Sequence, residues 1–207
     1  MKKIAIIILL LVSTTLFAKE YRYRYHFLPL PKPNLYIKGK KAVISSNGLT
    51  ISVEQIEKIP LEKDFSVFSI DPNVFFIYFK IKITNNSGKK VYIDPNFISL
   101  VSNKKEYRKP MLYNDLYRAL AKKYPQSKIN QTLSKYLLDF ANPIKPGDRI
   151  ERYLIFRNFR EKVKKAMLTF DAVSIGVEQS TFLIIYSVQG EKFDAKKLKL
   201  KEKKKTF

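Results

Sequence analysis

One run of alternating side chains, in VFFIYFKIKIT (residues 74–84), limits the fold of this chain more than any other feature. Every second residue of the run is a large apolar one: Phe75, Ile77, Phe79, Ile81 and Ile83. Lys80, Lys82 and Thr84 occupy positions between them. A period of two puts the apolar residues on one face of a β-strand, whereas a helix would scatter them around its axis. The run therefore predicts a half-buried strand of an antiparallel sheet.

A polar turn and a second β-like run follow this strand. Asn85, Asn86, Ser87 and Gly88 are residues that favour turns, and apolar residues return at 91–93. The segment FKIKITNNSGKKVYIDP (residues 79–95) therefore predicts a β-hairpin in the core.

Short strands recur along the rest of the chain. They are predicted at 49–53, 97–101, 150–156, 166–173 and 181–188, and turn residues such as Asn-Gly and Pro-Gly precede some of them. Many short strands separated by turns are typical of a sandwich of two sheets. The predicted fold class is mainly β, an antiparallel β-sandwich.

A helical segment at about 112–141 interrupts the strands. Leu112, Leu116 and Leu120 recur every four residues, and a second stripe from Ile129 to Phe140 follows Pro125. Ser127 is the predicted N-cap of the second helix. The pair is interpreted as a two-helix insertion that either covers an open end or edge of the sandwich or recognises a partner.

The two ends of the chain differ from the middle. Residues 1–18 have a basic start, a short apolar run and a small residue at Ala18, which predicts a secretory signal peptide. An extended arm rich in Tyr, Arg and Pro is predicted at 19–41, the sandwich at 42–190, and a Lys-rich disordered tail at 191–207. We therefore expect a periplasmic or secreted protein with no membrane span after signal cleavage, because the apolar run is too short to cross a bilayer.

The amino-acid composition excludes several kinds of catalytic and metal-binding site. The chain has no cysteine, which excludes disulfides, thiol nucleophiles and thiolate metal sites. His26 is the only histidine, so a Ser-His-Asp triad or a multi-histidine metal site within the sandwich is not expected. We expect no catalysis, no cofactor and no metal. "IDPN" occurs twice, at 70–73 and 93–96, and is interpreted as a turn in preference to a calcium site.

The formal net charge of +22 favours anionic partners. Export makes nucleic acid the least expected of these, so the candidates are another envelope protein or an anionic envelope polymer. The alternative is that the lysines only form a solvated surface.

The arm carries the candidate ligand-binding residues. They alternate in the sequence YRYRY: Tyr21, Arg22, Tyr23, Arg24 and Tyr25. In an extended strand the tyrosines face one way and the arginines the other. Tyrosine stacks on sugars or bases, and arginine binds phosphate or carboxylate in a bidentate way. The alternative is an edge strand whose tyrosines pack on the sandwich while its arginines stay in water.

Three segments together resemble a known family. They are VFFIYFKIKITNNSGKKVYIDPNFISLVSNKKEYRK, IKPGDRIERYLIFRN and TFLIIYSV. They are similar to bacterial exported domains of unknown function with a telokin-like, immunoglobulin-like β-sandwich, the fold of a secreted immunoprotective antigen. The resemblance covers roughly residues 42–110 and 143–190. It implies a compact module outside the cytoplasm with no established catalysis.

Two hypotheses of function follow. The first is a non-catalytic exported β-sandwich that acts as a protein-interaction or envelope-assembly module. The alternative is binding of a polyanion or glycan, such as peptidoglycan or lipopolysaccharide, through the Tyr/Arg arm and the Lys-rich tail.

Overall fold

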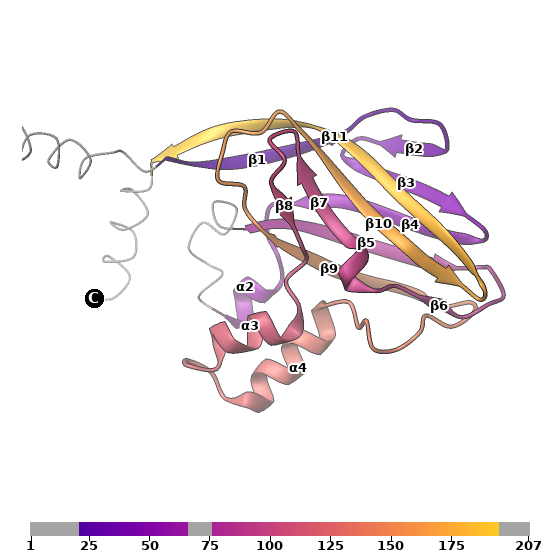
Figure 1. Cartoon of the computed structure of the whole chain (residues 1–207). Helices are drawn as coiled ribbons and strands as arrows, with labels where there is room; N and C mark the ends of the chain where they lie inside the picture. Colours follow the sequence, from indigo (N-terminus) through magenta and orange to yellow (C-terminus); the bar gives the residue numbers. More distant parts are fainter. Residues whose placement is uncertain (1–20, 66–75, 195–207) are drawn as a thin grey trace, which may run out of the picture.

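A computed structural model describes residues 21–65 and 76–194 of the chain, and two antiparallel sheets face each other in it (Figure 1). The strands are β1 (Tyr21–Pro29), β2 (Leu35–Lys38), β3 (Lys41–Ser46), β4 (Leu49–Ile56), β5 (Phe76–Asn85), β6 (Val91–Tyr92), β7 (Ile98–Ser102), β8 (Tyr107–Arg108), β9 (Arg149–Arg157), β10 (Lys165–Ile175) and β11 (Glu178–Asp194). The helices are α2 (Leu61–Asp64), α3 (Tyr113–Leu120), α4 (Gln126–Tyr136) and the 3-10 turn η3 (Pro95–Phe97).

Sheet A has the strand order β1-β11-β10-β7-β8, with β6 paired to β10, and sheet B has the order β2-β3-β4-β5-β9. The named strands pair antiparallel throughout the described residues. The predicted mainly β class is confirmed, and the two facing sheets are consistent with a β-sandwich.

The predicted hairpin at residues 79–95 is wrong. β5 pairs with β4 and β9 in sheet B, whereas β6 pairs with β10 in sheet A, so the turn carries the chain from one sheet to the other. The buried side chain of Asn85 holds this corner, because its amide donates to the carbonyls of Lys89 and Ile144 and its oxygen accepts from Ser87. A polar turn between two strands does not reveal which sheet the second strand joins.

The central core lies between the two sheets, and four aromatic side chains meet in it. Phe27 and Tyr186 come from sheet A, and Phe79 and Phe156 come from sheet B. Phe79 is central, with ring centroids 5.4 Å from Phe27, 5.7 Å from Tyr186 and 6.0 Å from Phe156. Most of these contacts are edge-to-face, the arrangement that the ring quadrupole favours.

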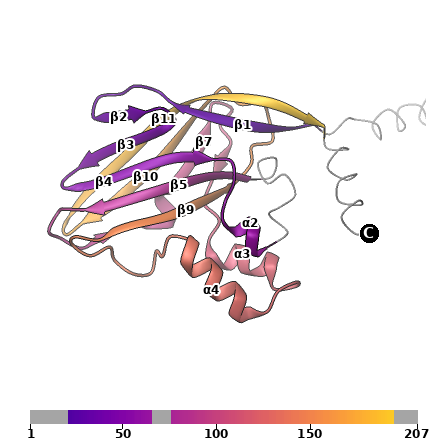
Figure 2. The same ribbon diagram turned by 180° about the vertical axis from the view of Figure 1, so that it is seen from behind.

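A second apolar core lies on the outer face of sheet B. Tyr78 and Ile155 alternate with the inward residues of β5 and β9, and α2, α3 and α4 cover them with Leu116 and Leu133 among others. Figures 1 and 2 show these helices together at one end of the sheets. The two predicted helices are present, but the N-cap of α4 is Pro125 with no side-chain cap, and not Ser127. Ser127 falls inside the first turn, because Pro125 itself sets the extended backbone at the start.

The boundaries of the sandwich also need correction. The predicted start at residue 42 is too late, since β1 pairs with β11 along its whole length and Phe27 is fully buried. The predicted tail begins too early, since β11 continues to Asp194. Both errors have one cause: each segment is ordered by the other, across most of the chain length. The remaining tail and the predicted signal peptide lie outside the described residues.

Candidate functional site

A basic hollow of about 680 Å³ opens where three distant segments meet. They are β1, the turn between β7 and β8, and the connection between β9 and β10. The residues that line the hollow are Tyr23, Asn103, Lys104, Arg160, Glu161, Lys162 and Lys164. We refer to this set as the basic hollow.

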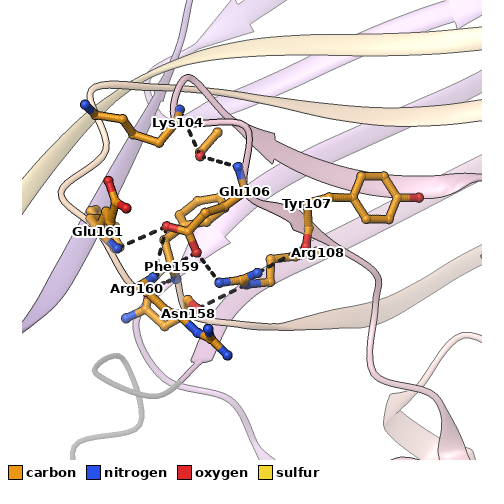
Figure 3. Close-up of polar contacts among 10 residues, drawn as sticks. Lys104, Glu106, Tyr107, Arg108, Asn158, Phe159, Arg160 and Glu161 are labelled. Carbon is orange, nitrogen blue, oxygen red and sulfur yellow. Dashed lines mark hydrogen bonds and ion pairs between the residues drawn. The ribbon is translucent and has the colours of Figure 1, made fainter.

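The partly buried carboxylate of Glu106 holds the two loops of the hollow together (Figure 3). Glu106 accepts hydrogen bonds from the Arg108 guanidinium and from the backbone N–H groups of Arg160 (3.0 Å) and Glu161 (3.0 Å). Arg108 in turn donates to the carbonyl of Asn158 at 3.2 Å. The charge of Glu106 is therefore compensated inside the protein, and it does not neutralise the surrounding lysines.

Asn103 makes the second link between the loops. Its side-chain oxygen accepts from the backbone N–H groups of Lys164 (3.0 Å) and Lys165 (3.1 Å), and its own N–H donates to the carbonyl of Lys165. Ser102 shapes the turn that carries it, because its hydroxyl accepts from the N–H groups of Lys104 and Glu106. The backbone on both sides of the hollow is thus fixed by hydrogen bonds, while the lysine head groups are not.

The charge that faces the hollow is strongly unbalanced. Lys104, Arg160, Lys162 and Lys164 are exposed, and Glu161 is the single acid in the lining. Within residues 21–65 and 76–194, none of these four cations forms an ion pair. Positive charge that is unpaired and concentrated in a concave surface raises the local concentration of anions.

The arm contributes the aromatic wall. The half-buried ring of Tyr23 lines the hollow and stacks on Tyr25 at 5.9 Å with an interplanar angle of 28°. Tyr25 is buried, packs edge-to-face on Phe159, and donates its hydroxyl to the carbonyl of Glu161. Burial raises the pKa of the Tyr25 phenol above its ordinary value, so this hydroxyl stays a donor.

The five predicted ligand-binding residues separate in the structure. Tyr23 lies at the hollow and Tyr25 supports it from below. Arg24 is on the opposite face of β1, 3.9 Å from Glu191. Tyr21 and Arg22 belong to β1, but their side chains lie outside the described part of the structure. The structure therefore brings one predicted residue to the site and places one arginine away from it.

Sequence reasoning missed the cations of the hollow. Their signal is present in two short basic runs, NKKE at 103–106 and REKVKK at 160–165, each of which connects two strands. Lysine-rich turns are so common in this chain that neither run stands out before the loops are placed side by side.

Side chains of Asn158 and Gln55 hydrogen-bond to the backbone along the free edge of β1. Asn158 donates to the carbonyl of Tyr23 at 2.7 Å, and Gln55 both donates to the carbonyl of Tyr25 and accepts from the N–H of Phe27. These bonds use the backbone groups that an added strand would need. At Tyr23, Tyr25 and Phe27 the free edge of β1 is therefore already occupied and does not offer these groups to an added strand.

The repeated Asp-Pro-Asn motif is described at one of its two positions. Asp94 caps η3 by accepting from the N–H of Asn96 at 2.7 Å, which is a turn role. Residues 70–73 lie outside the described chain. Where side chains are described, no three His, Cys, Asp or Glu residues gather closely enough to hold a metal ion.

Among the helices in residues 21–65 and 76–194, none has both the length and the apolar character that crossing a membrane requires. Comparisons with protein-family models, with curated proteins and with solved structures found no match to this chain.

Proposed function

We propose that this protein is an exported, non-catalytic binding module that binds an anionic polymer of the cell envelope, such as peptidoglycan or lipopolysaccharide, at the basic hollow. The observation that carries the proposal is the lining of the hollow: four exposed cations, one acid and one aromatic ring. Nucleic acid is not the proposed ligand, because residues 1–18 have the pattern of a signal peptide.

The chemistry of the lining fits a charged glycan. Lysine and arginine head groups donate hydrogen bonds to phosphate or carboxylate, and each such contact is stronger when one partner is charged. Tyr23 presents a ring held in place by Tyr25, on which a sugar can stack. The loop backbone is already ordered by Glu106 and Asn103, so ligand binding orders only side chains.

The order of the strands supports an immunoglobulin-like topology, which we propose as the finer description of the fold. The series β8-β7-β10-β11 follows the C′-C-F-G order of that fold, and β4-β5-β9 follows A-B-E. On this proposal α3 and α4 are an insertion between C′ and E, while β1 and the β2-β3 pair extend the two sheets.

The proposed function is tested by reversing charge at the hollow and at a distant site. Lys162→Glu/Lys164→Glu changes the hollow, and Lys122→Glu/Lys123→Glu makes the same change of net charge after α3. Co-sedimentation with purified peptidoglycan and with lipopolysaccharide is measured at roughly 50 and 300 mM salt, because exposed charge interactions are screened over this range.

We expect the hollow variant to bind about tenfold more weakly at low salt, since two exposed charge contacts become repulsive. The matched control should stay within about twofold of the unchanged protein. Equal losses in the two variants would show that net charge alone causes binding, and the proposed site would be wrong.

A second function, docking of another envelope protein, is favoured by one further observation. On the outer face of sheet A, an apolar row crosses four strands in register: Ile185 opposite Met167, Met167 opposite Val101, and Val101 opposite Tyr107. Ile185 and Tyr107 are 36% and 49% exposed. A continuous row of partly exposed apolar side chains is a common feature of protein interfaces.

Salt separates the two functions. Docking on the apolar row should survive high salt, be lost in Met167→Glu, and persist in Lys162→Glu/Lys164→Glu. A purified partner whose binding to Met167→Glu is unchanged would exclude this row as the interface.

A further inference from the structure

A second cavity, of about 380 Å³, lies on the other side of the molecule from the arm, between the helices and the edge of sheet B. It exists because β9 is the edge strand and two chain segments attach to it side by side. The N–H of Met111 donates to the carbonyl of Ile155 at 2.7 Å, and Leu137 forms a bridge with Tyr153. The cavity opens between these two attachments.

The floor of this cavity joins the two apolar cores. Leu138 and Leu154 belong to the central core, and Leu133 and Leu137 belong to the helix-side core. All four are buried as residues, yet all four line the cavity. Small-molecule sites have volumes of about 300–1,000 Å³, and a dry cavity of about 150 Å³ already holds a benzene ring. The space is therefore sufficient for one short aliphatic chain or one substituted ring.

A single carboxylate marks the rim. Asp139 is exposed and accepts from the side-chain amide of Asn142 at 2.7 Å and from the N–H of Ala141 at 2.9 Å. These hydrogen bonds, first that from Asn142, lower the pKa of Asp139, so the group is negative at neutral pH. Arg152 is the nearby cation, but it donates to the carbonyl of Glu151, and Asp139 has no ion-pair partner in the described chain.

We propose that this cavity is a binding site for a small amphiphile with one short apolar chain and a primary ammonium group, with the chain on the leucine floor and the ammonium at Asp139. The site is separate from the basic hollow, and the two have opposite preferences for charge. This proposal does not depend on the function assigned to the hollow.

Octylamine and octanoate are suitable probes, because they share a chain length and carry opposite charges. Titration calorimetry measures each with the intact mature chain, and nuclear Overhauser effects locate the chain terminus against the leucine methyl groups. Ser134→Phe fills the cavity from an exposed position of α4, and Ala141→Phe fills it from the segment that follows α4. Gln131→Phe, on an exposed position of α4 outside the cavity, is the matched control.

We expect octylamine to bind the unchanged protein with one-to-one stoichiometry, and each filling variant to weaken it at least about tenfold, because the chain loses its buried surface. Gln131→Phe should change the affinity by less than about twofold. Asp139→Asn should weaken octylamine by about two- to fivefold, the size of an exposed ion pair, and should not weaken octanoate.

Two results would overturn the proposal. One is octylamine binding that is the same in Ser134→Phe, Ala141→Phe and Gln131→Phe, which would show adsorption elsewhere. The other is a component of binding that is lost on filling the cavity but prefers octanoate. Melting temperatures of all variants without ligand identify any that fail to fold. If one of Ser134→Phe and Ala141→Phe fails to fold, the other tests whether octylamine binds in the cavity.

Discussion

The two apolar cores on either side of sheet B are built by different rules. The central core receives every second residue from strands of both sheets, and Phe79 and the three rings around it come from β1, β5, β9 and β11. The helix-side core receives residues from one end of the outer face of sheet B and from three helices. The central core depends on the alternation of side chains along the strands. The helix-side core depends on which part of sheet B the helices cover.

Strand β5 shows the difference within one segment. Phe79 faces the central core, while its neighbour Tyr78 is fully buried under the helices. Further along the same outer face, Lys80 and Lys82 bind the carboxylate of Glu151 in water. The outer face of β5 is therefore apolar where helices cover it and charged where they do not. The helix-side core is confined to the covered end of sheet B.

The largest effect is expected at the middle of the central core. Phe79→Ala should lower the free energy of unfolding by about 3–5 kcal/mol, because it removes contacts with three rings and leaves a cavity that links both sheets. Denaturant unfolding followed by circular dichroism measures it. Tyr36→Ala, at a position 66% exposed, is the control and should stay within about 0.5 kcal/mol. A loss below about 1 kcal/mol would mean that Phe79 is not central to stability.

Leu133→Ala tests whether the second core is an independent unit. The residue is fully buried in the helix-side core, and we expect a loss of about 2–4 kcal/mol. Because the helices pack on one face only, hydrogen exchange should accelerate more in α3 and α4 than in β10 and β11. Equal acceleration in helices and strands would show that both cores unfold as one.

Tyr186→Phe is expected to raise stability by up to about 1 kcal/mol. The hydroxyl is buried in the central core and, in the chain as described, has no hydrogen-bond partner, so its removal relieves a desolvation penalty. Burial raises the pKa of Tyr186 in the folded state. Above about pH 10, the ordinary tyrosine value, this phenol ionises in the unfolded chain before it does in the folded one, so the unchanged protein loses stability and the advantage of Tyr186→Phe should grow. Unfolding at pH 7 and above pH 10 measures both effects, and a less stable variant would show that the hydroxyl has a partner.

The smallest effect is expected on the uncovered part of sheet B. Glu151→Gln should cost about 0.5 kcal/mol or less, since the side chains of Glu151 and Lys80 are each 35% exposed. Hydrogen bonds from Lys80 and then Lys82 lower the pKa of Glu151. The stabilisation is therefore present above its ordinary value near pH 4.5 and is lost as the pH falls through the folded-state pKa. Melting temperatures at neutral and acid pH test this, and a difference that persists in acid would exclude the ion pair as its cause.

Strand positions could be predicted because alternation is a local property. β4, β5, β7, β9, β10 and β11 lie where the apolar residues alternate. β1, β2 and the start of β3 fall within the predicted arm, because alternate prolines and aromatic residues dominate that segment. Phe27 is fully buried only because β11, from the other end of the chain, pairs with β1. The alternation of tyrosine and arginine allows the alternative of an edge strand that packs on the sandwich, and β1 is such a strand, but the alternation does not identify β11 as its partner.

The sequence pattern predicts one of the residues that line the basic hollow. The alternation of tyrosine and arginine predicts Tyr23 as a ligand-binding residue, and Tyr23 lines the hollow. Lys104 and the lysines at 162 and 164 reach the same hollow from loops far apart in sequence, held by Glu106 and Asn103. Lysines are too frequent in this chain for a linear pattern to select them.

Alternation and turn residues by themselves determined that this chain forms antiparallel strands and that a pair of helices interrupts them. The pairing of β6 with sheet A, the entry of β1 into the core, and the meeting of three loops around the hollow were decided only in the tertiary structure. Side-chain periodicity depends on neighbours two to four residues away, whereas strand partners and concave sites depend on contacts between residues far apart in the sequence, such as Asn158 with Tyr23, 135 positions apart.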